Sequence, residues 1–258
     1  MKHSAKYIIL WLAVLLLSFP ACVMVDDGWG VGGFGGVDSG HGQHVIIGSG
    51  RVVIITFGFR DFTRISLSQS FKATIRKSNT YSVRVEVDDN IEQYLTAHQS
   101  GNSISIGLED NSYKDITMNV TIETPDVSLI EATGAASIRL DGFELDHSIQ
   151  IVASGASNFN GNLTASEVTF NLTGSSTVAL TGGADDLNVY GTGAMQLSLF
   201  EFPVRNCKAV MTGGSVSNVS VSDNLEVSLT GGSVLRYKGN PTTRILSITG
   251  GSVIQKVG

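Results

Sequence analysis

Four aspartates and one histidine occupy equivalent places in a repeated sequence pattern. Side chains of these types could cleave a polysaccharide. Asp126, Asp185, Asp186, Asp223 and His147 each stand seven or eight residues before a regularly spaced glycine. Carboxylates that converge with Arg or Lys on adjacent turns of a fold can serve a lyase or a hydrolase. Aspartate is also a preferred turn residue. We expect the turn role, so no catalytic residue is assigned and the chain is predicted not to be an enzyme.

Residues that could bind a metal are present, but not in a ligand pattern. His41 and His44 lie in a Gly-rich segment, where no cysteine or carboxylate completes a set of ligands. The chain has 2 cysteines, Cys22 and Cys207. A bridge between them would have to span a flexible stretch, so we expect no disulfide framework. No metal and no cofactor are predicted.

A hydroxyl residue stands directly before each of the seven glycines. Such a column could recognise glycans or ice, but ice-binding faces need two aligned columns and only one is regular here. Threonine also suits an exposed strand position, where its hydroxyl bonds along the stack. We expect this ladder role, and we place recognition where the repeat is broken, around Asp185–Asp186 and Pro203 or before Pro125. The column consists of Thr133, Ser154, Thr173, Thr192, Thr212, Thr230 and Thr249.

The element that must position these residues is a Ser/Thr-Gly step that occurs seven times. Successive glycines are separated by 21, 19, 19, 20, 18 and 19 residues. A fixed period near twenty predicts a solenoid in which each repeat is one turn. Because twisted strands favour right-handed coiling, the expected fold is an all-β, right-handed parallel β-helix with a period of about 19–20 residues. The glycines are Gly134, Gly155, Gly174, Gly193, Gly213, Gly231 and Gly250.

Apolar residues occupy fixed places on both sides of each glycine. Those two, four and six residues before it predict one inward-facing strand, and those four and six residues after it predict another. Cys207 falls in an inward column and is expected to be buried. In the last repeat Leu246 takes an inward place. Arg244 and Lys256 break the pattern there, which predicts a polar end coil that hinders end-to-end association.

Residues 1–21 have the features of an export signal. They begin with basic residues, and the apolar run over residues 7–17 is too short to span a bilayer comfortably. A small residue directly before Cys22 resembles the lipobox of bacterial lipoproteins, although Phe19 and Pro20 differ from the commoner residues. The resemblance implies a lipoprotein signal peptide, with lipid on Cys22 as the new N-terminus. An ordinary cleaved secretory signal is the alternative.

The rest of the chain divides at residue 51. Residues 22–50 are rich in glycine, which predicts a flexible tether. From residue 51 β-prone segments begin, so residues 51–258 are expected to form the folded domain. The formal net charge of −6, without a stripe of Lys or Arg, argues against nucleic acid as a partner and against docking onto anionic lipid by charge.

Four segments in a fixed order carry a resemblance to a known family. They are Phe62–Ile65, Tyr81–Asn90, Val120–Pro125 and, after the repeated Ser/Thr-Gly steps, Arg236–Pro241. Over about residues 59–258 the chain resembles the auto-transporter adhesin head GIN domain family. That family is similar in being β-helical, bacterial and exported, often as lipoproteins. The resemblance implies an adhesion-type role and brings no catalytic residues with it.

These observations together lead to one expected function and two alternatives. We expect a non-enzymatic module of the bacterial cell envelope, an adhesin-like binding head that a lipid on Cys22 anchors to the outer membrane. Its expected partners are the membrane, through this anchor, and a surface glycan or a host or matrix protein. A polysaccharide lyase or hydrolase built on a β-helix is one alternative, and a purely structural envelope spacer is the other.

Overall fold

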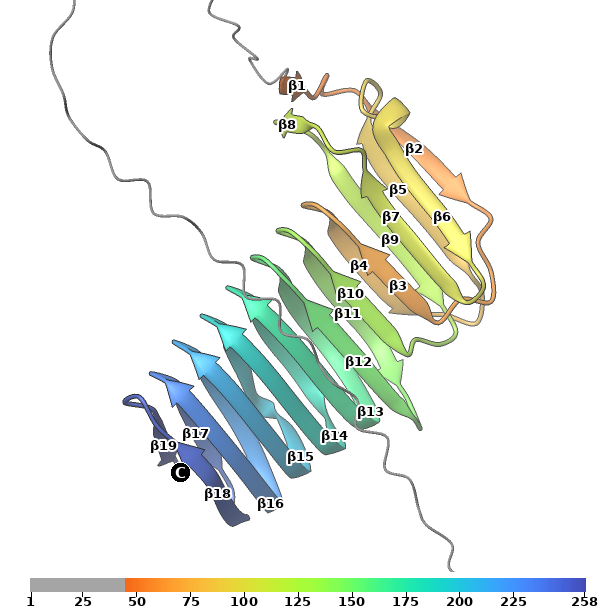
Figure 1. The fold of residues 1–258 in the computed structure, drawn as a ribbon. Helices are drawn as coiled ribbons and strands as arrows, with labels where there is room; N and C mark the ends of the chain where they lie inside the picture. Colours follow the sequence, from red (N-terminus) through yellow and green to blue (C-terminus); the bar gives the residue numbers. More distant parts are fainter. Residues whose placement is uncertain (1–44) are drawn as a thin grey trace, which may run out of the picture. The chain divides into compact units, whose positions relative to one another are not determined.

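In the computed structural model, which describes residues 45–258, most of the described residues lie in β-strands (Figure 1). This part contains one short 3₁₀ helix, η1 (Glu92–Tyr94), and no helix in it is long and apolar enough to cross a membrane. The strands are β1 (Val45–Ile47), β2 (Val52–Phe57), β3 (Arg64–Leu67), β4 (Lys72–Lys77), β5 (Ser82–Asp88), β6 (Leu95–Ser100), β7 (Ser103–Leu108), β8 (Ser112–Lys114), β9 (Met118–Thr124), β10 (Leu129–Ala132), β11 (Ser137–Glu144), β12 (Ser148–Ala153), β13 (Asn158–Gly174), β14 (Thr177–Gly193), β15 (Gln196–Gly213), β16 (Val216–Gly231), β17 (Val234–Lys238), β18 (Thr242–Ile248) and β19 (Val253–Lys256).

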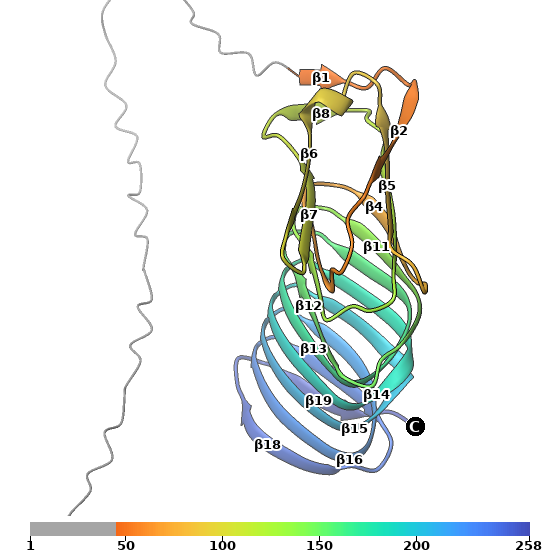
Figure 2. The same ribbon diagram turned by 90° about the vertical axis from the view of Figure 1, so that its right-hand side faces the viewer.

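The strands wind into a β-solenoid of about seven turns, which confirms the predicted architecture. Figure 2 shows the turns as stacked, flattened loops with two walls. The long strands β13–β16 each pass from one wall into the other. The threonine wall, named for its outward hydroxyl column, contains β6, β7, β3, β10, β12, the second halves of β13–β16, and β18. The opposite wall contains β2, β5, β9, β4, β11, the first halves of β13–β16, β17 and β19.

Like positions of successive repeats lie in register, as the sequence columns predicted. The residues four places after each glycine pair from turn to turn without interruption. Side chains from both walls meet in one hydrophobic core. A single turn could not bury its apolar side chains without its neighbours, so the stack is stable only as a unit. This inner column is Ile138, Phe159, Val178, Leu197, Ser217, Leu235 and Ile254.

A glycine with positive φ forms the corner at which each turn leaves the threonine wall. The seven corner φ angles lie between 66° and 112°. At Gly213 an added Cβ would lie 2.5 Å from the carbonyl oxygen of Gly193 in the preceding turn, which is too close for any side chain. Glycine is therefore required there both by the backbone conformation and by the close stacking of the corners.

The position two residues after each corner points into the core and is small in most turns. Ser215 Oγ and Ser233 Oγ donate to carbonyls of corner glycines, the latter to Gly213 at 2.9 Å. Ser157 and Ser176 donate instead to the carbonyl of the residue just before the corner. One turn has Met195 at this position, and the residue two places before its corner is then Gly191, where the preceding turn has Leu172. A Cβ on Gly191 would lie 2.1 Å from Met195 Cε. A large side chain at one of these two positions is thus matched by a small one at the other.

The N-terminal strands stack out of chain order. β3 and β4 form an inner turn, with β10 and β11 on one side of it and β7 and β9 on the other. Antiparallel pairing then adds β5 and β2 to the opposite wall and β6 to the threonine wall. β1 pairs with β8, so regular structure begins at Val45, ahead of residue 51. Residues 1–21, Cys22 and most of the expected tether lie outside the described residues.

The last turn departs from the expected columns. Its register shifts after Val227, so Ile245 and not Leu246 occupies the inward place opposite Val227. Arg244 consequently pairs with Glu226 on the outer face, with Nη1 3.5 Å from Oε2. The expectation of a polar end coil is wrong, because Ile245 and Leu246 are 53% and 49% exposed. The physical cause is that β18 pairs on one side only among the described strands, with β16, while one additional residue in it bulges and displaces the side-chain alternation.

Because Gly191 makes room for Met195, a second substitution at Met195 should restore the stability that a larger residue at Gly191 removes. Gly191→Leu alone should destabilise the solenoid by about 1–3 kcal/mol, because the new side chain displaces Met195 within the packed core. Adding Met195→Ser recreates the pair of the preceding turn, Leu172 with Ser176, and should recover most of that loss. Equilibrium denaturation of the three variants measures the coupling between the two sites. Strictly additive effects would contradict this compensation between the two positions.

A buried hydroxyl gives a second prediction. Ser217 is fully buried between Leu197 and Leu235, and its Oγ has no hydrogen-bond partner in residues 45–258. Ser217→Ala should raise the free energy of unfolding by about 1 kcal/mol, because it removes a polar group that has lost its hydration. Ser233→Ala is the matched control and should lower the free energy of unfolding, because it removes the donor to the Gly213 carbonyl. The same response at both serines would refute this account.

Candidate functional site

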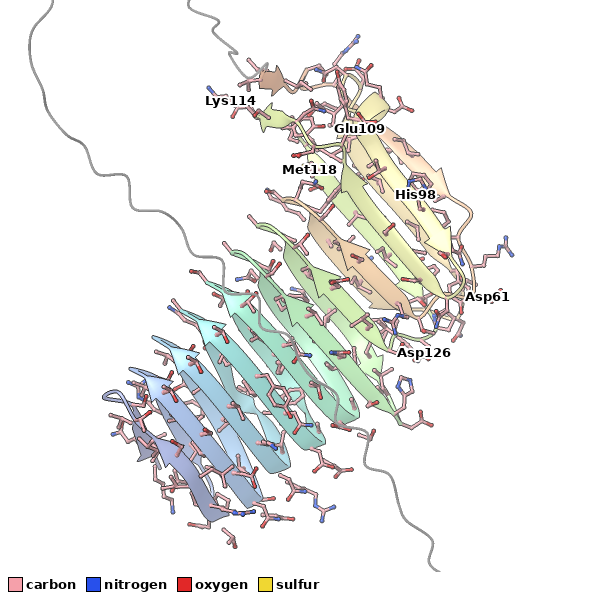
Figure 3. The ribbon with its side chains drawn as sticks, in the orientation of Figure 1. Asp61, His98, Glu109, Lys114, Met118 and Asp126 are labelled. Carbon is pink, nitrogen blue, oxygen red and sulfur yellow. The ribbon has the colours of Figure 1, made fainter. Side chains whose placement is uncertain are left out.

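The acidic turn residues lie along the edge at which the chain enters the threonine wall. Figure 3 shows Asp126 at this edge, where β9 ends, whereas Met118 marks the opposite edge, where β9 begins. Asp185 and Asp186 belong to β14, and Asp223 to β16. These acids therefore do not converge on a single point, and each has to be considered with its own partner.

Asp126 is paired with His147. The Nε2 atom of His147 lies 2.8 Å from Asp126 Oδ1, and its Nδ1 atom lies 2.9 Å from the carbonyl oxygen of Ser148. The hydrogen bond to Ser148 and, after it, the one to Asp126 raise the pKa of His147. Both ring nitrogens face acceptors, which favours the protonated imidazolium form. The pair closes a turn and leaves no free base for catalysis.

Arg205 brings two of the other acids together. Its Nε atom lies 3.2 Å from Asp223 Oδ2, and its Nη1 atom lies 3.8 Å from Asp185 Oδ1. Hydrogen bonds from Ser222 and then from Arg205 lower the pKa of Asp223. That carboxylate therefore stays ionised and is poorly suited to protonate a leaving oxygen. The three charged side chains form an exposed ionic cluster.

Two hollows lie where the repeat is broken, which is where recognition was expected. One, of about 430 Å³, adjoins Arg205 and forms where the strand register slips around Pro203. The other, of about 490 Å³, precedes Pro125 in the chain and lies between Gln69, Lys72 and Tyr113. Each hollow has a single charged side chain in its lining. Neither brings together the groups that an acid–base mechanism needs.

The hydroxyl column lies on the outer face of the threonine wall and stays in register from turn to turn. The expected ladder is only partly formed. Thr249 Oγ1 lies 3.5 Å from Thr230 Oγ1, and Thr173 Oγ1 donates to the carbonyl oxygen of Ala153 at 3.4 Å. In the part of the chain that the structure describes, the side-chain hydroxyls of Thr192 and Thr212 have no protein partner.

A polar ladder is formed instead by the columns five and seven residues before the corners. Asn206 Nδ2 donates to Asp186 Oδ1 at 2.8 Å, and Asn224 Nδ2 donates to Asn206 Oδ1 at 2.7 Å. Beside them Asn188 Nδ2 donates to Glu167 Oε1 at 2.6 Å. Polar residues at the same place of successive repeats were the available signal for this ladder. These columns use part of their hydrogen-bonding groups on one another.

An exposed aromatic ring on the same wall was not predicted from the sequence columns. Tyr190 lies three residues before a corner, between Asn171 and Val210 of the adjacent turns, and is 40% exposed. A shallow hollow of about 300 Å³ surrounds it and reaches from Val152 to Thr212. An aromatic residue in an outward column of otherwise smaller side chains is the sequence signal that could have identified this place.

Metal and thiol chemistry find no support in residues 45–258. No group of three His, Cys, Asp or Glu side chains in this range is placed to hold a metal ion. His41, His44 and Cys22 lie outside the described residues. Cys207 is buried in its inward column, as predicted, and burial raises the pKa of its thiol to about 12. A thiol of this kind packs as a small apolar side chain and is not a nucleophile.

Several solved structures have a similar fold. A putative adhesin from Bacteroides fragilis is 17% identical, with a TM-score of 0.76, and the match covers 82% of this chain and 100% of that one. A putative adhesin from Parabacteroides merdae is 19% identical, with a TM-score of 0.62 and coverage of 83% and 99%. A putative lipid binding protein from Parabacteroides distasonis is 18% identical, with a TM-score of 0.63 and coverage of 83% and 100%. At these identities the similarity shows the fold alone. No curated protein matches the chain.

The family is shown by the sequence of the solenoid itself. The family model described as "Putative auto-transporter adhesin, head GIN domain" matches residues 61–241. This range runs from just before β3 to just after β17, so it includes the N-terminal strands and most of the turns. It agrees with the resemblance carried by the ordered segments from Phe62 to Pro241. The chain therefore belongs to the auto-transporter adhesin head GIN domain family.

Proposed function

We propose that this chain is a non-enzymatic, adhesion-type binding module of the bacterial cell envelope, held at the outer membrane by a lipid on Cys22. Its family and the solved structures named as adhesins support a role in binding at the cell surface. The observation that carries the proposal is the long outer face of the threonine wall. Its charged side chains pair with each other, as Lys208 and Glu226 do at 3.5 Å, while neighbouring hydroxyls face outward.

A solenoid wall is well suited to binding a partner. Each strand segment is hydrogen-bonded to the turns on both sides, so the outward side chains repeat at a spacing of about 4.8 Å. Side chains held in this way lose little conformational freedom when a ligand orders them, which favours affinity. The module would therefore present a preformed surface instead of folding around its partner.

The proposed anchor and tether explain how such a surface would be presented. A lipid on Cys22 would fix one end of the chain to the membrane, with a second signal or protein contact strengthening the attachment. If the part of the expected tether before β1, residues 22–44, is flexible, its root-mean-square length would be roughly 25 Å. This length would let the solenoid reach partners beyond the lipid headgroups.

A polysaccharide-active enzyme is the second candidate function. The contact of Asp185 and Asp223 with Arg205 beside the Pro203 hollow is the observation that favours it. Against it stand the exposure of all three side chains and the lowered pKa of Asp223. A structural spacer, the remaining alternative, would have no use for an exposed aromatic ring such as that of Tyr190.

Lipidation predicts a change in membrane association. In a host that processes bacterial lipoproteins, the full-length chain should fractionate with the outer membrane, and Cys22→Ser should release it to the soluble fraction, because the acylated thiol is lost. Cys207→Ala is the matched control and should stay with the membrane, since Cys207 is buried in the core. If Cys22→Ser fractionates like the unmodified chain, the anchor is refuted.

Binding without turnover is the prediction for the module itself. The purified full-length chain is applied to a panel of immobilised glycans and matrix proteins, and the same glycans are assayed for newly formed reducing or unsaturated ends. We expect retention on at least one class of partner and no cleavage of any polymer. Cleavage that disappears in Asp185→Asn or Asp223→Asn would favour the enzyme. The absence of binding to every panel member would overturn the adhesion-type role.

A further inference from the structure

We infer that the hollow around Tyr190 on the threonine wall is a binding site for a neutral glycan, with a pyranose ring stacked on the tyrosine. The inference rests on the proposed function, and it names the site and the ligand class that this function leaves open. Four adjacent turns line the hollow, through β12, β13, β14 and β15. Its volume of about 300 Å³ and its position on a flat wall suit an extended chain better than a globular ligand.

The aromatic ring supplies the first element of recognition. Among residues 45–258, Tyr190 is the most exposed aromatic residue, at 40%. In its outward column the ring lies between Asn171 and Val210, with Val152 beyond Asn171, so it has an amide neighbour on one side and an apolar neighbour on the other. The electron-rich face of an aromatic ring attracts the weakly positive C–H groups on one face of a pyranose, and contact with both removes apolar surface from water. Rigid tyrosines on strands are common binding hot spots.

Unpaired polar groups supply the second element. Within residues 45–258 no protein hydrogen bond is made by the side chains of Asn171, Tyr190, Thr192 or Thr212, all of which line the hollow. They can therefore donate to and accept from sugar hydroxyls without breaking bonds inside the protein. The hydroxyls of successive turns recur at about 4.8 Å, a spacing on the scale of one sugar ring. The neighbouring Asn and Asp ladder already uses part of its hydrogen-bonding capacity within the protein.

The charge around the hollow selects among glycans. No charged side chain lines it. Among the ionic groups on the wall, Lys208 is paired, with its Nζ 3.5 Å from Glu226 Oε1, and Glu167 accepts a hydrogen bond from Asn188. The chain as a whole carries a formal charge of −6, which opposes polyanions. A neutral glycan complements this surface, whereas a sulfated or uronic-acid polymer would meet no unpaired cation there.

The test distinguishes the contribution of the Tyr190 ring to binding from any effect of its replacement on folding. The purified full-length chain is screened against defined neutral and acidic oligosaccharides, and the dissociation constant for the best neutral one is measured by titration. Tyr190→Val places the side chain of the next turn at this position, so the strand should be retained, and we expect at least a ten-fold weaker Kd. Tyr190→Phe should bind within about three-fold of the original chain, since stacking remains.

Matched controls lie on the opposite wall. Ile54→Ala removes a comparably exposed apolar side chain, 57% exposed, and should leave the Kd unchanged. Thr192→Val should weaken binding about three- to ten-fold by removing a hydroxyl, whereas Thr177→Val, which makes the same change on the opposite wall, should not. Thermal denaturation followed by circular dichroism checks each fold. If Tyr190→Val is unfolded, Tyr190→Asn, the residue of the preceding turn, takes its place.

The outcomes distinguish this inference from the proposed function. Neutral glycan binding that is lost in Tyr190→Val and kept in Ile54→Ala supports both. Binding only to acidic glycans or to a matrix protein, or neutral glycan binding that Tyr190→Val leaves intact, overturns the Tyr190 site while the adhesion-type role stands. A chain that binds neither glycans nor matrix proteins overturns both.

Discussion

Parallel hydrogen bonding between successive corners is the constraint on which the rest of this structure depends. The backbone N–H groups of Ala156, Ser175 and Ala194 each donate to the carbonyl of a glycine one turn earlier, at 2.7 to 2.8 Å. The corners can approach so closely only because a glycine stands at each of them, at a φ that other residues rarely adopt. Once the corners are stacked, the length of each turn and the register of both walls follow.

Register has opposite consequences inside and outside the coil. Inside, every deviation of one side chain has to be absorbed by its neighbours, as Gly191 absorbs the bulk of Met195. Ser217 is not compensated in this way and leaves a buried hydroxyl without a partner in the described residues. Outside, register converts one residue per turn into a column. The side chains of a column therefore either hydrogen-bond to one another along the stack or remain available to hydrogen-bond to a partner.

This distinction separates binding from catalysis on the same scaffold. The acids at the turns are drawn into pairs with His147 and Arg205 or into the amide ladder, because like turns bring complementary side chains within reach. Pairing of this kind lowers the pKa of Asp223, so this carboxylate stays ionised and is poorly suited to act as a general acid. The hydroxyl column and the ring of Tyr190 remain outside these pairs, and so the wall is better suited to recognition.

The repeat, the corner glycines and the inward columns were predictable from the sequence, because they depend on side-chain alternation and backbone freedom within a single turn. The resemblance carried by the ordered segments likewise predicted the family. Sequence alone did not reveal the stacking of β7 and β9 before β3, the bulge that puts Ile245 opposite Val227, or the exposure of Tyr190. Each of these depends on which distant segments pair and where the register slips. Such pairing is determined by contacts between residues far apart in the sequence, which exist only once the turns are assembled.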